Sequence, residues 1–340
     1  MKMFEQEKIP LAVVGATGLV GQKAIAMIDH HPEFYVAEIA ASDQRAGQTF
    51  EESVCWREPG DIPKSVCTLK LKPIKEVNNR YVISALPASV AQEVEPALAS
   101  QGSFVFTNAS AFRMHQDVPI LIPEINIDHL SLLERQKTPG KIITNSNCMV
   151  AFIALALEPL MELGAIEHVS VVTMQAISGA GYPSIDSIDI MGNIIPHIAG
   201  EEEKIITETL KILGTQTQPA SFGITVHVHR VPILHGHTVA LHIHFASSVN
   251  MHDINDIYLS RNQSWPGLYR LYHEVARPQP ARDIGPYDQS VHIGRIKQGA
   301  RDNIIGLIAM GNNLARGAAG ASVRNMEATL QYNSSRENRV

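Results

Sequence analysis

The chain has 340 residues, of which 45% are hydrophobic and 18% are charged, and its formal net charge is −6. This length favours two domains, each with its own core. The acidic balance excludes non-specific nucleic-acid binding, because no cationic excess exists to displace counterions, and no apolar run reaches the roughly 18 residues of a membrane span.

The first residues, MKMFEQEK, carry charges where a secretory leader needs an apolar segment. The three cysteines, Cys55, Cys67 and Cys148, form no pair with metal-ligand spacing, and their odd number does not suit a disulfide framework. We therefore expect a cytoplasmic protein.

The first part of the chain alternates between strand-like and helical patterns. Short apolar runs predict buried parallel strands at 10–14, 36–41, 81–87, 103–108, 119–123 and 141–145. Helical spacing follows the first run at Val20, Ala24, Met27 and Ile28, and residues 89–100 are predicted to form another helix. This alternation predicts an α/β domain with a doubly wound, mostly parallel sheet.

From about residue 148 the pattern changes. Residues 168–178 and 224–245 alternate in polarity, as strands of a mixed or antiparallel sheet with one covered face do. Residues 311–332 are rich in small side chains and then helical, and are long enough to return to the first domain. The predicted domains are therefore 1–147 plus 314–340, and 148–313.

The segment VVGATGLVG places Gly15, Gly18 and Gly21 between a strand and a helix. Gly15 would form a tight turn, Gly18 would let a pyrophosphate approach the backbone, and Gly21 would allow close helix–strand packing. The spacing alone is only modestly specific, but its place in a βαβ pattern favours a dinucleotide site. After the second strand, Asp43 would favour NAD and Arg45 would favour NADP, and spacing does not choose between them.

Cys148 follows the polar run TNSN and precedes the apolar run MVAFIALAL. A cysteine there is either a small hydrophobic core residue or a nucleophile activated by the N-terminus of a helix. His227 and His229, like His242 and His244, alternate along strands and could share a face. No Asp, Glu or Cys lies between residues 224 and 245 to complete a zinc site, so we expect no metal.

Together these features resemble the aspartate-semialdehyde dehydrogenase family, in its archaeal and fungal-type branch. The resemblance rests on GATGLVG, SALP, NASAFRM, DVPILIPEIN, NSNCMVAF, QAISGAGYP, GEEEKI, RVPILHGHT and GNNLARGAA. It implies a Rossmann-like NAD(P)-binding domain, an α/β catalytic and dimerisation domain, and a homodimer or homotetramer. The implied reaction is the NADP-dependent reductive dephosphorylation of L-aspartyl-4-phosphate to aspartate semialdehyde and phosphate, in the biosynthesis of lysine, methionine and threonine.

The resemblance also assigns roles to individual residues. It implies Cys148 as the nucleophile, His237 as the acid/base and Gln175 as a residue that orients the substrate. The implied substrate-binding residues are Arg113, Asn147, Glu201, Lys204 and Arg230. The implied cofactor-binding residues are Gly15, Thr17, Gly18, Leu19, Val20, Gly21, Ser42, Arg45, Ser178, Gly179 and Asn313.

Four alternatives accompany this interpretation. The family has an arginine two places after the serine that ends the second strand, whereas here Asp43 and Gln44 put Arg45 one place later, so NAD stays possible beside NADP. A related branch reduces short acyl-CoA thioesters. A catalytically silent dinucleotide-binding protein would have no chemical need for Cys148 and His237, and a cysteine hydrolase would leave the glycine-rich segment unexplained.

Overall fold

A computed structural model describes residues 8–337 of the chain. The chain divides into two compact units: unit 1 comprises the residues up to 121, then 130–145 and those from 319 onward, and unit 2 comprises 122–129 and 146–318. The domain division predicted from the sequence stays a prediction, and these units differ from it mainly in grouping 122–129 with unit 2. The expectation about a leader concerns residues that lie almost wholly outside the described range.

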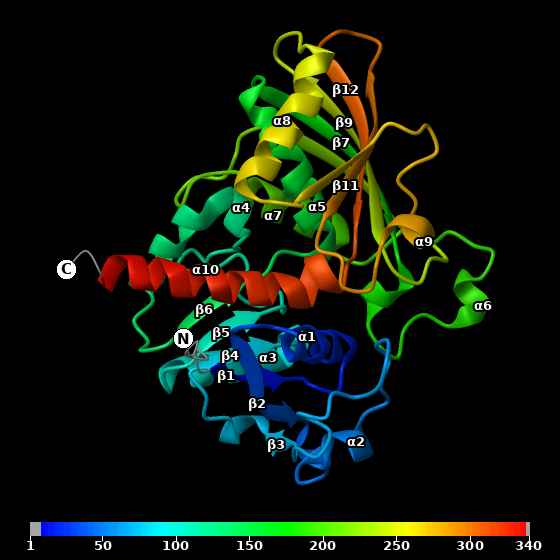
Figure 1. Cartoon of the computed structure of the whole chain (residues 1–340). Coiled ribbons are helices and arrows are strands. Elements are labelled where there is room, and N and C mark those ends of the chain that lie inside the picture. The colour runs from blue at the N-terminus through cyan, green and yellow to red at the C-terminus, as the bar shows by residue number, and fades with distance from the viewer. Residues whose placement is uncertain (1–7, 338–340) are drawn as a thin grey trace, which may run out of the picture. The chain divides into compact units, whose positions relative to one another are not determined.

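Unit 1 is built on a six-stranded parallel sheet with the order β3-β2-β1-β4-β5-β6 (Figure 1). Its strands are β1 (Ile9–Val14), β2 (Phe34–Ala41), β3 (Lys72–Pro73), β4 (Tyr81–Ser84), β5 (Phe104–Thr107) and β6 (Lys141–Thr144). This order is that of the Rossmann fold. The predicted doubly wound α/β domain is therefore confirmed.

Helices cover both faces of this sheet. They are α1 (Leu19–Asp29), α2 (Phe50–Ser53), α3 (Ala88–Ser100) and α10 (Gly320–Glu337). α1 and α10 pack with Leu11 and Val13 in one core, and α3 packs with Ala12 and Val14 in the other. Successive β1 side chains thus enter opposite cores, as the alternation of a strand requires. α10 packs in the core of unit 1, and the predicted return of the chain near residue 314 stays a prediction.

The predicted strand at 119–123 is wrong. Only Ile120 pairs with the sheet, in an isolated parallel bridge to Thr144, and Pro123 begins the short helix α4 (Pro123–Asn126). Pro119 and Pro123 flank the apolar run and have no N–H to donate to a strand ladder.

Unit 2 contains a mixed six-stranded sheet with the order β10-β11-β12-β9-β7-β8. Its strands are β7 (Ile166–Gln175), β8 (Gly223–Arg230), β9 (His237–Phe245), β10 (Tyr269–Tyr272), β11 (Val291–Gln298) and β12 (Ile304–Gly311). β7 pairs in parallel with β8 and antiparallel with β9. The predicted mixed sheet is therefore confirmed.

Three longer helices of unit 2 lie on one side of its sheet: α5 (Cys148–Leu157), α7 (Glu201–Ile212) and α8 (Met251–Ser264) (Figure 1). α5 packs against β9, β11 and β12, and α7 packs against β8. Two further helices, α6 (Ser187–Ile190) and α9 (Pro280–Asp283), are single turns. Among the described residues, no helix combines the length and apolar character needed to cross a membrane.

Candidate active site

The candidate site of unit 2 begins at the N-terminus of α5, where Cys148 is the first helical residue. Asn147 caps the helix, since its Oδ1 accepts hydrogen bonds from Met149 N at 2.8 Å and Val150 N at 3.4 Å. Every later residue of α5 is buried, whereas Cys148 is partly exposed. The cap thus fixes a thiol that solvent can reach at the positive end of the helix dipole.

His237, the first residue of β9, lies against this thiol. Its Nε2 is 3.1 Å from Cys148 Sγ, and its Nδ1 accepts a hydrogen bond from Ala176 N at 3.0 Å. A backbone N–H can only donate, so a neutral His237 carries its proton on Nε2, facing the sulfur. Burial, followed by the charge of Arg230, lowers the pKa of His237 from 6.5 to about 3. The imidazole is therefore neutral at physiological pH.

Gln175 and Arg230 end two adjacent parallel strands and pair with each other in register. Arg230 is buried and donates from Nη1 to Ala176 O at 2.7 Å, while its Nε has no hydrogen-bond partner in the described structure. Burial lowers the pKa of Arg230, and the nearby Cys148 and Glu201 oppose that shift. A buried guanidinium with an unused N–H next to a thiol is suited to holding an anionic substrate.

Helix α7 contributes Glu201, which links Asn147 to Gln175. Glu201 Oε1 accepts hydrogen bonds from Asn147 Nδ2 at 2.9 Å and from Gln175 Nε2 at 3.1 Å. Lys204 lies three residues later on the same helix and is partly buried. The side chains predicted for nucleophile, acid/base and substrate orientation therefore meet in one connected cluster within unit 2.

Ser178, Gly179 and Asn313 adjoin this cluster. A Cβ at Gly179 would lie 2.9 Å from both Arg230 Nη1 and His237 Cε1, so only glycine leaves those two side chains in place. Asn313 Nδ2 donates to Ser178 Oγ at 3.0 Å, and its Oδ1 accepts from Gly236 N at 2.9 Å. Their predicted contacts with the cofactor stay predictions.

Two residues of this cluster were not predicted from the sequence. Glu208 is buried, and its Oε2 accepts a hydrogen bond from Asn147 N at 2.6 Å. A Cβ at Gly317 would lie 2.8 Å from Cys148 Cβ, so this glycine lets the chain pass directly beside the thiol. The seven-residue spacing from Glu201 to Glu208, about two helical turns, is the one signal that could have pointed to Glu208.

In unit 1, the glycine-rich turn has the backbone that a dinucleotide requires. Gly15 has φ +78°, and a Cβ there would lie 2.6 Å from Ala85 O, while a Cβ at Gly21 would collide with Gly15 O. Gly18 is the N-cap of α1 and provides no side-chain cap. Thr17, Leu19 and Val20 are partly exposed at the start of α1. The free N–H groups at this helix N-terminus are suited to a pyrophosphate.

The end of β2 leads into an exposed turn. Ser42 precedes a 3-10 helix formed by Asp43–Arg45, and all four residues are exposed. Arg45 makes no ion pair with any residue between 8 and 337. Its guanidinium is therefore available to a ligand phosphate. Arg113, also in unit 1, is buried and donates from Nη2 to Asn108 O at 2.7 Å, and its predicted phosphate contact stays a prediction.

The paired histidines of unit 2 make contacts within the sheet. His229 Nδ1 lies 3.1 Å from Thr173 O, and the ring of His244 packs edge-on against that of His168. His227 and His242 are exposed. Over residues 8–337 no group of three or more His, Cys, Asp or Glu side chains is arranged to hold a metal ion.

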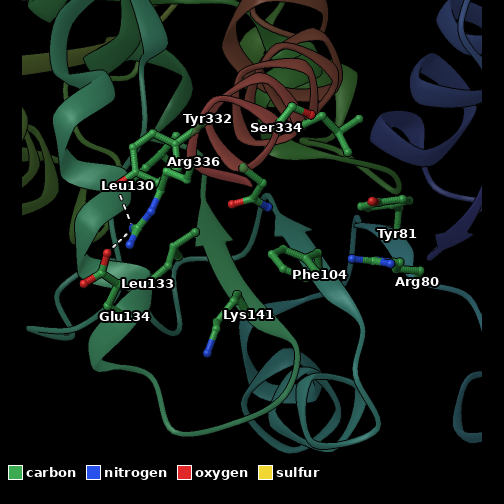
Figure 2. Close-up of a pocket in the computed structure, with 12 residues that line it drawn as sticks. Arg80, Tyr81, Phe104, Leu130, Leu133, Glu134, Lys141, Tyr332, Ser334 and Arg336 are labelled. Atoms are coloured by element: carbon green, nitrogen blue, oxygen red, sulfur yellow. Dashed lines mark hydrogen bonds and ion pairs between the residues drawn. The ribbon is translucent and has the colours of Figure 1, made fainter. Parts of the chain in front are cut away.

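Figure 2 shows a pocket of unit 1 beside the C-terminal part of α10. Its cations already have partners within the protein. Arg336 pairs with Glu134, Lys141 Nζ donates to Gln136 O and Thr138 O at 2.7 Å each, and Arg80 stacks on Tyr81. The pocket lining contains no thiol or histidine, so this pocket has no group suited to the predicted chemistry.

Comparison with known proteins agrees with both units. Residues 10–133 match the semialdehyde dehydrogenase NAD-binding domain, and residues 157–316 match the semialdehyde dehydrogenase dimerisation domain. An aspartate-semialdehyde dehydrogenase of Archaeoglobus fulgidus is 42% identical, with 94% of this chain and 98% of the relative covered. The Schizosaccharomyces pombe enzyme of the same name is 34% identical, with 94% and 98% covered.

The fold gives the same result. The crystal structure titled as aspartate semialdehyde dehydrogenase with NADP from Candida albicans is 29% identical to this chain. It superposes with a TM-score of 0.84, covering 96% of this chain and 99% of that one. The chain belongs to the aspartate-semialdehyde dehydrogenase family and is an oxidoreductase with a dinucleotide-binding domain and a dimerisation domain.

Proposed function

We propose that this chain reduces L-aspartyl-4-phosphate to L-aspartate 4-semialdehyde and phosphate with NADPH, through a thioester on Cys148. The contact that carries the proposal is the 3.1 Å approach of His237 Nε2 to Cys148 Sγ at the N-terminus of α5. The reaction needs a nucleophile that forms and later releases an acyl group, and a thiolate does both.

The first step is attack of the Cys148 thiolate on the acyl carbon, followed by loss of phosphate. Because His237 Nδ1 accepts a hydrogen bond from Ala176 N, Nε2 carries the proton of the neutral ring. This N–H points at Cys148 Sγ and stabilises the thiolate by donating a hydrogen bond to it. The helix N-terminus and the buried Arg230 also favour the anion. The positive end of the α5 dipole can stabilise the oxyanion that forms on attack.

In the second step the thioester is reduced and collapses to the aldehyde. NADPH supplies the hydride when it is bound, and Ser42 and Arg45 would hold its 2′-phosphate while the glycine-rich turn holds its pyrophosphate. The reduced carbon carries an alkoxide, which collapses to the aldehyde and returns the electron pair to sulfur. This collapse needs no net proton, so the Nε2–H of His237 acts as a hydrogen-bond donor to the returning thiolate.

The remaining groups bind the substrate. Arg230 holds the α-carboxylate, with Glu201 and Lys204 near it, and Gln175 orients the acyl group. Arg113 and Asn147 contact the phosphate. Asn147 contributes with its second amide hydrogen, since one already bonds Glu201 and its oxygen caps α5.

We also propose that the protein is cytoplasmic and a homodimer or homotetramer, as a chain with a dimerisation domain over residues 157–316 would be. No nucleic acid or membrane partner is needed.

The test runs the reaction in reverse. Protein is mixed with aspartate semialdehyde, phosphate and NADP⁺, and the absorbance of reduced cofactor is followed; we expect phosphate-dependent reduction. Parallel assays use NAD⁺, and short acyl-CoA thioesters with NADPH in the reductive direction. Faster turnover of an acyl-CoA than of the semialdehyde would replace the proposed substrate.

A further inference from the structure

Three asparagines and a serine form a polar network inside unit 1, called the amide network. Asn108 directly follows β5 and Asn145 directly follows β6, while Ser322 and Asn325 belong to α10, which packs against β4 and β5 (Figure 1). Asn145, Ser322 and Asn325 are 1% exposed or less. Burying an amide costs stability unless hydrogen bonds replace those made with water. The carboxyl ends of parallel strands, where this network lies, are also the edge at which doubly wound sheets bind ligands.

Hydrogen bonds connect the four side chains of the amide network. Asn325 Nδ2 donates to Asn145 Oδ1 at 2.8 Å, and Asn145 Nδ2 donates to Asn108 Oδ1 at 2.8 Å. Ser322 Oγ accepts from Asn145 Nδ2 at 2.8 Å and from Asn108 Nδ2 at 3.1 Å. The orientation of each amide is therefore set by its neighbour, and α10 orients Asn108 from 214 positions away in the sequence.

One atom of the network is unsatisfied. Asn325 Oδ1 is buried and has no hydrogen-bond partner among residues 8–337. A buried carbonyl oxygen without a partner costs stability, so packing alone would favour an apolar side chain at this position. Stability therefore does not explain Asn325, whose contribution is the hydrogen bond that it donates to Asn145.

The network ends at the side chain proposed to bind phosphate. Asn108 N and Nδ2 both donate to Ser84 O at 2.9 Å, and the carbonyl oxygen of Asn108 accepts from Arg113 Nη2 at 2.7 Å. A guanidinium carries its N–H groups in one fixed plane, so the acceptor of one nitrogen sets the direction of the others. The position of Asn108 thus determines where Arg113 can receive an anion.

The network orients Arg113 without neutralising its charge. Its members are amides and a hydroxyl, none of which is a carboxylate. Arg316 shows the contrast, because it forms a bidentate ion pair with Glu124 at 2.8 and 2.9 Å. Orientation by a neutral oxygen suits a guanidinium whose charge is to be used on a dianionic ligand such as phosphate.

We propose that the amide network positions the Arg113 guanidinium for the phosphate group. Asn325 is then a positioning residue that acts through Asn145 and Asn108. The inference rests on the proposed contact between Arg113 and phosphate. Because hydrogen bonds in a chain polarise and orient one another, a change at Asn325 reaches Arg113, and it affects phosphate rather than the semialdehyde.

The test uses Asn325→Leu, which removes the donor at the end of the network and keeps a side chain of similar size. Phosphate-dependent NADP⁺ reduction gives separate KM values for phosphate and for aspartate semialdehyde. We expect the KM for phosphate to rise about tenfold, the effect of one weakened charged hydrogen bond. The KM for the semialdehyde and the Kd for NADP⁺ should stay near their wild-type values. Ser322→Ala, a smaller substitution that removes an acceptor shared by two amides, should raise the same KM.

Thr329→Val is the matched control on α10. Thr329 is buried, and its hydroxyl donates to the backbone carbonyl oxygen of Asn325 at 2.6 Å rather than to a side chain of the network. This variant should lower the temperature of unfolding and leave both KM values unchanged. If Asn325→Leu and Ser322→Ala raise both KM values equally, or raise neither, the network supports the fold alone and the inference is wrong.

Variants of Arg113 separate this inference from the proposed reaction. Arg113→Ala should raise the KM for phosphate by about 100-fold or more, since its charge-assisted hydrogen bonds are lost. Adding Asn325→Leu to Arg113→Ala should raise this KM no further, because both changes act on the same contact. An unaltered KM for phosphate in Arg113→Ala would refute the proposed phosphate contact and the inference with it. A further rise in the double variant would leave that contact intact and overturn the positioning role alone.

Discussion

The glycine-rich turn of unit 1 and the thiol cluster of unit 2 are built by different means. Backbone conformation shapes the first: Gly15 adopts φ +78°, and Gly21 packs where no Cβ fits. Hydrogen bonds between side chains shape the second: the carboxylate of Glu201 accepts hydrogen bonds from both Asn147 and Gln175. A site of the first kind is visible as a sequence pattern, whereas a site of the second kind becomes visible only when the partners are known.

Unit 1 also contains a buried carboxyl group, that of Glu95, which has no role in the proposed reaction. Glu95 is fully buried, and its Oε1 accepts from Ser84 Oγ at 2.6 Å and Thr107 Oγ1 at 2.5 Å. Burial raises the pKa of Glu95 to about 7. The hydrogen-bond partners of Glu95 are hydroxyl groups, whereas Glu201 lies near the Arg230 guanidinium. Burial of an acid alone therefore does not identify a reacting site, while an acid with a thiol and a cation does.

The largest effect is expected for Cys148→Ala. Loss of the nucleophile should lower kcat by roughly four orders of magnitude or more, because the acyl group then has no carrier. The assay is phosphate-dependent NADP⁺ reduction, with NADP⁺ binding and thermal unfolding measured in parallel and expected to change little. Cys55→Ala, at an exposed free cysteine, is the matched control. Turnover of the Cys148 variant above a few per cent of wild type would refute a thioester mechanism.

Much of the fold, and part of each of the two sites, could be predicted from the sequence. The glycine spacing, the parallel sheet of the first domain and the place of Cys148 before an apolar helix all follow from local patterns. Glu208 could not be predicted, because EEEKIITE reads as a solvated helix start until its contact with Asn147 N is seen. The tautomer of His237 depends on Ala176 N, 61 residues away in sequence. The false strand at 119–123 arose because apolarity outweighed the two flanking prolines.

His237 provides the next test. His237→Ala should lower kcat by about 10²- to 10³-fold, the usual cost of removing a donor to a developing anion. His237→Gln keeps an N–H donor and should recover part of that loss. In the wild type, the rate of Cys148 alkylation by iodoacetamide should show no step near pH 6.5, because burial holds the pKa of His237 near 3. A histidine step near neutral pH would instead support a proton-transferring His237.

Glu208 tests whether the cluster depends on partners beyond the reacting groups. Glu208→Leu leaves Asn147 N without an acceptor, so α5 should shift and kcat should fall about 10- to 100-fold. Glu208→Gln retains an acceptor oxygen and should restore kcat and Cys148 alkylation to near wild-type rates. Glu203→Leu, at an exposed position of the same helix, is the control. Equal losses in the Gln and Leu variants would mean that the charge, not the hydrogen bond, matters.

Arg45 tests the backbone-built site, where we propose that this exposed side chain selects the cofactor. Arg45→Ala should weaken NADP⁺ binding about tenfold or more and leave NAD⁺ binding nearly unchanged, because only NADP⁺ has a 2′-phosphate. Fluorescence titration with both cofactors measures this, and Asp43→Ala is the companion variant. If Arg45→Ala weakens both cofactors equally, Asp43 reads the ribose instead.

The smallest effect concerns Glu95 and changes stability rather than activity. Folding raises the pKa of Glu95 from 4.5 to about 7, so the folded chain binds more protons than the unfolded chain between these pH values. The contribution of Glu95 to the free energy of unfolding is therefore complete below pH 4.5 and is lost as the pH rises through 7. The loss is on the order of 3 kcal/mol.

Glu95→Gln keeps a carbonyl oxygen for the two hydroxyls and removes the titration. We expect urea unfolding to show wild-type stability falling from pH 5 to pH 8 relative to this variant, so that the variant is the more stable of the two at pH 8. Glu93→Gln, at an exposed position of α3, should track the wild type. Parallel stability curves for Glu95→Gln and wild type would show that folding leaves the ionisation of Glu95 unchanged, and would contradict a pKa raised by burial.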